Sequence, residues 1–179
     1  MYQDVLKAIA ERCSIRSYKS EPVSRELLDQ LLAAAVQAPS ARNSQPWHFS
    51  VVQDEKLLTI INQEVAAELG RFDDIFYQAP LVIFLSADPQ GGYSRIDCGI
   101  AVENIALAAQ ALGLGSVILG MPSHAFKGEK ADWLRQRLRF PRGYDFMIAI
   151  AIGWPAAGKD PHPVDPGKID LIEPLGSDD

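Results

Sequence analysis

The sequence has few of the residues that bind metals or form disulfides. Its two cysteines, Cys13 and Cys98, form no CxxC pair, and neither His48 nor His124 has a second histidine or cysteine at ligand spacing. No metal site is therefore expected. Together with the lack of an export signal, the cysteines indicate free thiols in a reducing cytoplasm. No GxSxG nucleophile motif and no obvious pair of hydrolytic carboxylates is present either.

The sequence also lacks excess positive charge and long apolar runs. Its formal net charge is -6, and its pI is about 5.0, which argues against general nucleic-acid binding, since that needs a basic surface. The longest apolar runs, APLVIFL and FMIAIAIG, are much shorter than the ~20 residues that cross a bilayer. We expect no nucleic-acid or membrane partner and a cytoplasmic location.

What the sequence does have is apolar periodicity that indicates one sizeable core. Hydrophobic residues make up 47% of the 179 residues, which is typical of a globular domain. Ser24 and Asp54 are expected to cap helices, Gly70 to end one, and Asp97 to begin a long central helix. Further helices are expected at 2–11 and 128–138, and strands at 48–52, 81–87, 116–120 and 145–153.

These elements predict the fold class and the domain organisation. Helices and strands mix without strict alternation, which favours an α+β fold with a sheet covered by helices. Residues 1–155 are expected to form one domain. Residues 156–179 are rich in proline, have no helical period and read as an extended arm. The arm still contains apolar residues, which predicts packing on a second subunit: Val164, Ile169, Leu171 and Ile172.

Four patches, taken in order, carry a resemblance. They read RCSIRSY at 12–18, APSARNSQPW at 38–47, GIAVENIALAAQALGLGSVILG at 99–120 and IAIGWP at 150–155. This arrangement resembles the nitroreductase family of flavin enzymes. The resemblance implies an FMN-binding homodimer of nitroreductase-like α+β fold, with a central, mainly antiparallel sheet flanked by helices. It also implies that the C-terminal arms are exchanged between subunits and that both active sites lie at the interface.

The resemblance further implies an activity. The protein would be an FMN-dependent oxidoreductase that uses NAD(P)H to reduce nitroaromatic or quinone-like acceptors, by ping-pong hydride transfer through flavin N5. The flavin would do the electron chemistry, so no side chain is assigned as a catalytic acid or base. The alternative is a flavin-binding or redox-sensing module with little turnover, and specialised flavin chemistry such as reductive dehalogenation ranks last.

The first patch offers groups that suit a flavin phosphate. Arginine donates in pairs and stays charged, and the resemblance places Arg12 and Ser14 at the phosphate and ribityl side. Cys13 would contribute through its backbone, and Arg16 would lie near the pyrimidine edge. The alternative is that both arginines are surface cations beside a helix C-terminus.

The second patch has more polar groups than a turn needs. The resemblance places Pro39, Ser40, Ala41 and Asn43 against the flavin held by the partner subunit. The alternative is a polar helix C-cap and strand entry, which explains Pro39 but leaves Asn43 without a role.

The third and fourth patches depart from the family pattern. Leu119 and Gly120 would form the turn under the flavin, with a backbone N–H aimed at N5, although better-known members often have glutamate at the Leu119 position. His162 and Val164 stand where the family usually has a basic pair for the phosphate. His162 could still donate one hydrogen bond to the phosphate, whereas Val164 cannot, and the alternative for His162 is a solvated arm residue. Lys159 or Lys168 would compensate if the arm shifts; otherwise phosphate binding would be weaker or carried by Arg12 and Arg16.

The sequence also contains an arginine cluster and several aromatic residues in irregular segments. The arginine cluster at 135–142 is expected to be a solvated helix end, with the phosphates of NAD(P)H as a minor possibility. Four aromatics in irregular segments receive no role: Phe72, Phe76, Tyr77 and Tyr93.

Overall fold

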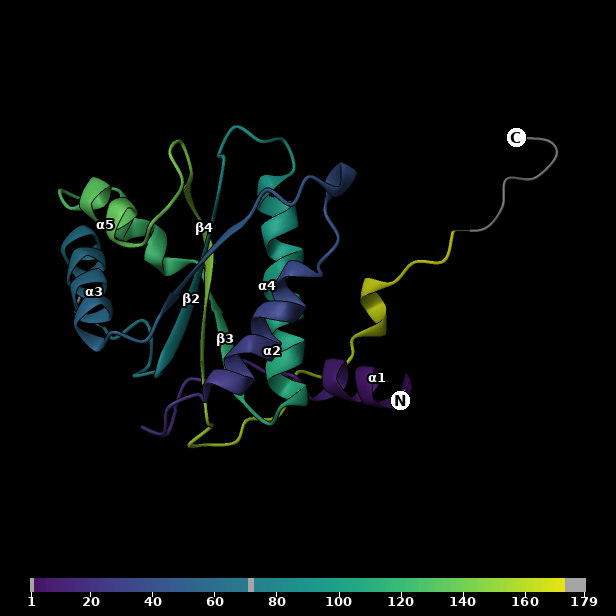
Figure 1. Cartoon of the computed structure of the whole chain (residues 1–179). Helices are drawn as coiled ribbons and strands as arrows, with labels where there is room; N and C mark the ends of the chain where they lie inside the picture. Colours follow the sequence, from purple (N-terminus) through teal and green to yellow (C-terminus); the bar gives the residue numbers. More distant parts are fainter. Residues whose placement is uncertain (1, 71–72, 173–179) are drawn as a thin grey trace, which may run out of the picture.

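A four-stranded antiparallel sheet with helices on both faces forms the centre of the protein (Figure 1). The computed structural model describes residues 2–70 and 73–172. The strand order is β1-β2-β4-β3. The strands are β1 (His48–Val52), β2 (Leu81–Ala87), β3 (Gly115–Leu119) and β4 (Asp145–Gly153). The helices are α1 (Tyr2–Glu11), α2 (Arg25–Val36), α3 (Glu55–Leu69), α4 (Ser94–Ala111) and α5 (Ala131–Arg137), with short 3-10 helices η1 (Ala41–Asn43), η2 (Met121–Phe126) and η3 (Pro166–Lys168).

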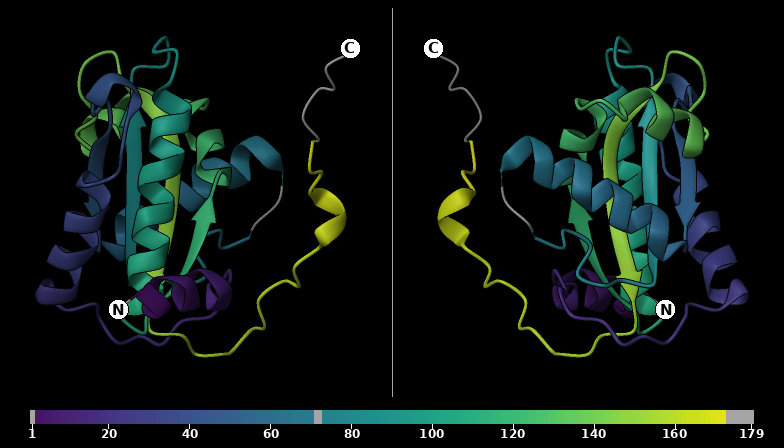
Figure 2. Two further views of the ribbon diagram at one scale, coloured as in Figure 1. Left: turned by 90° about the vertical axis from the view of Figure 1, so that its right-hand side faces the viewer. Right: turned by 90° about the vertical axis from the view of Figure 1, so that its left-hand side faces the viewer.

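The sheet divides the core into two layers. Because strand side chains alternate, Val82 and Phe84 of β2 join a cluster with α3, η2 and α5, whereas Leu81, Ile83 and Leu85 join a cluster with α2 and α4. Figure 2 shows α2 and α4 over one face and α3 with α5 over the other. The predicted α+β fold with a mainly antiparallel sheet is therefore confirmed.

Several predicted helix ends are confirmed. The Ser24 hydroxyl accepts from Leu27 N at 3.3 Å, and Asp54 Oδ1 accepts from Lys56 N at 3.0 Å. Gly70 closes α3 in the left-handed conformation (φ 67°), which glycine adopts without penalty.

Two predicted helix bounds were wrong. The long helix α4 begins at Ser94, because the Gly91 carbonyl accepts from Ser94 N and the Tyr93 carbonyl from Asp97 N. Asp97 thus lies inside the first turn and is only 2% exposed. The helix expected at 128–138 is limited to Ala131–Arg137.

The chain after β4 leaves the domain as an extended arm (Figure 1). Apart from η3, residues 156–172 form no helix or strand, and every one of them is exposed. The rest of the predicted arm, 173–179, lies outside the described residues. Both cysteines are free thiols. No helix within 2–70 and 73–172 is long and apolar enough to cross a membrane.

Candidate functional site

The N-terminal segment after α1 is hydrogen-bonded to one end of the sheet. Ile15 N donates to Ser116 O at 2.9 Å, which attaches the segment to β3. Further along, Lys19 N donates to Trp154 O at 2.8 Å, just after β4. Parts of three of the four sequence patches therefore meet where β3 begins and β4 ends: residues 12–18, Gly115 with Ser116, and residues 153–155.

Gly115 permits this close approach. A Cβ at Gly115 would lie 2.9 Å from Ile15 Cγ2 and 3.0 Å from Ile15 Cβ, and real Cβ atoms do not come so close. Since Ile15 is buried, glycine at this position lets the segment carrying Ser14 and Arg16 lie directly on β3.

Tyr18 fixes the far end of the same segment. Its hydroxyl donates to the carbonyl of Ile15 at 2.8 Å and lies 3.2 Å from the carbonyl of Ala151. Burial raises the pKa of Tyr18 far above its ordinary value, against the lowering influence of Arg16, so the hydroxyl remains a donor. Tyr18 therefore joins the segment to β4.

The two arginines of the segment have different surroundings. Arg12 is partly buried and its Nε lies 3.3 Å from Glu103 Oε1 on α4. Arg16 is exposed, and its guanidinium carbon lies 5.9 Å from the centre of the Tyr77 ring, a cation–π geometry. Both side chains therefore have partners that restrict their positions.

Within one chain, the arm contacts this segment at Lys159 and not at His162. Cys13 Sγ donates to Lys159 O at 3.1 Å, and a hollow of about 300 Å³ is lined by Cys13, Gly115 and Lys159 among others. His162 is exposed, and its one hydrogen-bond contact within the described chain is with the Pro163 carbonyl, at 3.1 Å.

The 38–47 loop has an unusual backbone. Arg42, Asn43 and Gln45 have φ angles of 55°, 53° and 45°, a left-handed region that costs non-glycine residues about 1–2 kcal/mol each. Internal hydrogen bonds compensate in part, because the hydroxyl of Ser40 accepts from Gln45 N at 2.9 Å and Asn43 Oδ1 accepts from Gln45 Nε2 at 2.9 Å. Pro39 and Asn43 are exposed, and Ser40 and Ala41 are half-buried.

One contact fastens this loop to α4. Ala41 N donates to Asp97 Oδ1 at 3.0 Å. Arg12 pairs with Glu103, which is six residues further along the same helix, about 9 Å by helical rise. One chain thus holds the two expected halves of the site at different places along α4.

The turn after β3 leaves its backbone accessible. Leu119 is buried at the end of the strand, whereas Gly120 is exposed and is the N-cap residue of η2. A Cβ at Gly120 would have no atom within 4 Å, so a flat ligand could approach the main chain here.

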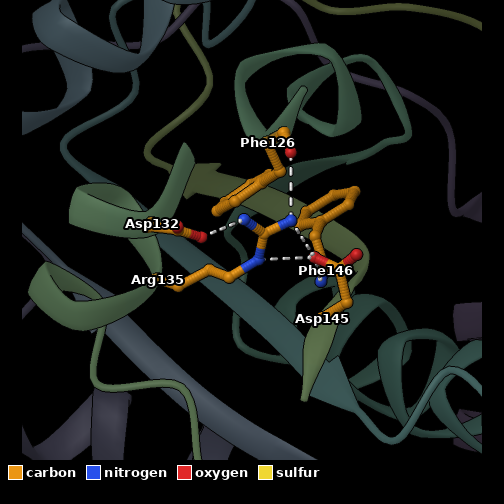
Figure 3. A network of polar contacts seen from close by, with 5 residues as sticks. All are labelled: Phe126, Asp132, Arg135, Asp145 and Phe146. Atoms are coloured by element: carbon orange, nitrogen blue, oxygen red, sulfur yellow. Dashed lines mark hydrogen bonds and ion pairs between the residues drawn. The ribbon is translucent and has the colours of Figure 1, made fainter. Parts of the chain in front are cut away.

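Arg135 holds the other end of η2 (Figure 3). Its Nη2 donates to Phe126 O at 3.0 Å, its Nε to Asp145 Oδ1 at 3.1 Å and its Nη1 to Asp132 Oδ1 at 3.1 Å. The guanidinium also lies 5.9 Å above the Phe126 ring. The prediction of a wholly solvated arginine cluster was therefore wrong for Arg135, which joins η2, α5 and β4.

Apolar side chains are exposed on α1, on α4 and along the arm. On α4 they follow a helical stripe, and such a set is typical of an interaction surface. The residues are Val5, Leu6 and Ile9 on α1, Tyr93, Ile96 and Ile100 at α4, and Val164, Ile169, Leu171 and Ile172 on the arm.

Fold and site together define an antiparallel α+β protein whose candidate ligand groups come from an N-terminal segment, a strained loop and a strand-end turn. Residues 9–154 match the Nitroreductase family. The chain therefore belongs to the nitroreductase family, as the four patches predicted.

Individual relatives agree with this assignment. The chain is 36% identical over 163 residues to a putative NADH dehydrogenase/NAD(P)H nitroreductase of Archaeoglobus fulgidus, covering 88% of this chain and 89% of the relative. It superimposes on a nitroreductase with bound FMN from Desulfitobacterium hafniense DCB-2 with a TM-score of 0.90 at 38% identity, covering 97% of this chain and 100% of that one. A nitroreductase with bound FMN from Bacteroides fragilis gives 0.87 at 25% identity, covering 94% and 98%.

Sequence reasoning missed three residues of the site region. Tyr18 lies inside a recognised patch but was given no role, and Tyr77 was left as a packed aromatic. Asp97 was interpreted only as a helix start. An acidic residue among the apolar positions of α4 was a usable signal, because a buried carboxylate needs a partner. Of the other aromatics, Phe76 is buried and Tyr93 exposed, and Phe72 lies outside the described residues.

Proposed function

We propose that this protein is an FMN-dependent oxidoreductase that uses NAD(P)H to reduce nitroaromatic or quinone-like acceptors. The observation that carries the proposal is the position of Arg12, Ser14 and Arg16 on the segment bonded to β3 at Ser116, with the exposed backbone of Gly120 after the other end of the same strand, in a chain similar to nitroreductases with bound FMN. Bound FMN would supply the redox chemistry, accepting a hydride at N5 and passing reducing equivalents to the acceptor in a ping-pong cycle.

The residues present fit a flavin phosphate and its ring. Arg12 and Ser14 supply a guanidinium fork and a hydroxyl at the sheet end, which suit a dianionic phosphate. Glu103 now shares the Arg12 guanidinium at 3.3 Å. Phosphate binding would therefore require Arg12 to turn partly away from that carboxylate, which is itself nearly half exposed.

Arg16 is suited to the electron-rich edge of the ring. The Tyr77 face beneath its guanidinium limits the positions of the side chain without neutralising the charge. A fixed positive charge there would stabilise the reduced, anionic ring. The exposed main chain at Gly120 provides the site of the N–H donor proposed for N5.

Lys159 would replace the basic pair that the family usually has in the arm and that this chain lacks. Since the Lys159 backbone contacts Cys13, its ammonium can serve the phosphate side in place of His162, for which no such contact exists among residues 2–70 and 73–172. We keep His162 only as a second donor that would require the arm to move.

We propose that the active form is a homodimer. Pro39, Ser40, Ala41 and Asn43 would cover the flavin held by the other subunit, because a chain's own loop is fastened at Asp97, away from its own Arg12. The exposed apolar residues of α1, α4 and the arm would be buried in the same assembly.

An absorption spectrum followed by steady-state kinetics tests the function. The purified protein, titrated with FMN, is expected to bind the flavin and to bleach with NAD(P)H under argon. NAD(P)H oxidation should saturate with menadione or a nitrofuran. A protein that does not bind FMN would contradict the proposed cofactor. A protein that binds FMN but shows no saturable turnover would instead be a flavin-binding or redox-sensing module.

A further inference from the structure

Asp97 is a buried acidic residue that the proposed function uses only as the point where the 38–47 loop is fastened. It lies in the first turn of α4 and is 2% exposed. Oδ1 accepts a hydrogen bond from Ala41 N at 3.0 Å, and Oδ2 is buried with no partner among the described residues. A half-satisfied buried carboxylate is costly, so its presence calls for a reason.

The backbone on the other side of this bond explains the need for an anchor. Arg42, Asn43 and Gln45 all adopt left-handed φ angles, which such residues leave unless surrounding contacts hold them. Two of those contacts, Ser40 with Gln45 and Asn43 with Gln45, lie within the loop itself. They can shape the loop but cannot fix its position relative to the helices.

The bond from Ala41 to Asp97 connects this strained loop to a helix of the core. α4 packs against the sheet and α2, and its residues Cys98 and Ala101, the next residue and one turn beyond Asp97, are 0% exposed. Asp97 therefore links the loop, at the residue just before its left-handed stretch, to a rigid element.

We infer that Asp97 is a positioning residue, whose carboxylate holds the 38–47 loop in the conformation that covers the flavin. The claim that Asp97 holds the loop rests on the structure alone. The claim that the held loop covers the flavin rests on the proposed function. Asp97 itself would not touch the flavin. It would act by sparing the ligand the cost of ordering the loop, which raises affinity.

The test uses two substitutions at Asp97 in the full-length protein. Asp97→Ala removes the acceptor for Ala41 N, whereas Asp97→Asn keeps an oxygen there and replaces the other carboxylate oxygen with a neutral amide nitrogen. Hydrogen exchange of peptides covering residues 40–47 should become about tenfold faster in Asp97→Ala and stay near the wild-type rate in Asp97→Asn.

FMN affinity should also fall more in Asp97→Ala than in Asp97→Asn. It can be measured by titration followed by visible absorbance. Asp97→Ala should bind FMN about tenfold more weakly, equal to ~1.4 kcal/mol, and Asp97→Asn should rescue most of that loss. Asp54→Ala is the matched control, because Asp54 also accepts from backbone N–H groups, at the start of α3. It should lower stability but leave loop exchange and FMN affinity unchanged.

The outcomes separate the two claims. Wild-type loop exchange in Asp97→Ala would overturn the anchor, and so would an Asp97→Asn variant as impaired as Asp97→Ala. If the wild-type protein bound no FMN, the proposed function would fail, while the exchange data would still decide whether Asp97 holds the loop.

Discussion

The contact between Gly115 and Ile15 makes a strong prediction about how the N-terminal segment is held. In Gly115→Ala the new Cβ would lie 2.9–3.0 Å from three Ile15 side-chain carbons, one of which is Ile15 Cβ. Rotation of the side chain cannot move that Cβ, so the backbone of the segment must shift away from β3. The bond from Ile15 N to Ser116 O would then weaken.

The size of the effect follows from these contacts. Overpacking costs about 1–3 kcal/mol and the weakened hydrogen bond about 1 kcal/mol, while alanine in a strand regains roughly 0.5–1 kcal/mol. We expect a net loss of about 2 kcal/mol, or a Tm lower by about 4–8 °C for a chain of this length. FMN should also bind at least tenfold more weakly, because Ser14 and Arg16 move with the segment.

Thermal unfolding by circular dichroism and FMN titration would measure both effects. Gly92→Ala is the control, since its Cβ would meet no atom within 4 Å and its φ is not positive. In a double-mutant cycle, Ile15→Ala removes the contacts with Cγ1 and Cγ2 but keeps Cβ, so it should relieve part of the clash and give a coupling of about 1 kcal/mol. A Gly115→Ala protein with wild-type Tm and FMN affinity, or strictly additive substitutions, would refute the reasoning.

Three further predictions concern single side chains. Tyr18→Phe should lower the unfolding free energy measured with urea by about 1 kcal/mol, because it removes the donor to Ile15 O while keeping the ring; an unchanged midpoint would contradict this. Arg135→Leu should cost about 1–3 kcal/mol in the same assay, since it leaves the Phe126 carbonyl without the Arg135 donor and removes the Arg135 bond to Asp145. The exposed Arg137→Ala should stay within about 0.5 kcal/mol, and equal losses in the two variants would contradict a structural role for Arg135. Arg16→Ala should lower the flavin reduction potential by roughly 30–60 mV, the effect of a unit charge at ~6 Å near a surface, with Arg16→Lys closer to wild type; a constant potential across all three proteins would exclude an electrostatic role.

Local signals predicted most of the fold. The caps at Ser24 and Asp54 and the left-handed stop at Gly70 depend only on residues within one turn, so the sequence contains the relevant physics. The strands were found from short apolar runs for the same reason. The start of α4 was misplaced because the usual capping role of aspartate was applied to Asp97, whereas that carboxylate is engaged by Ala41, 56 residues away.

The sequence offered candidate site residues but not their geometry. Arg12, Ser14 and Arg16 were proposed from one short patch and stay a prediction, and their position depends on pairing between Ile15 and Ser116, which no local pattern encodes. The same holds for the contact of Arg16 with Tyr77 and for the contacts that hold the partly buried Arg135. Lys159 could not be preferred over His162 until the path of the arm was known.

The central claim is that each flavin site combines the N-terminal arginines of one chain with the 38–47 loop of another. It can be measured in a heterodimer made by mixing an Arg12→Ala/Arg16→Ala chain with a Ser40→Ala/Asn43→Ala chain and purifying the mixed species with two affinity tags. Sites shared between chains predict one intact site, and so one tightly bound FMN per heterodimer, about half the wild-type value. A heterodimer that binds no FMN tightly, although the wild-type dimer binds two, would mean that each site belongs to a single chain and would contradict the account.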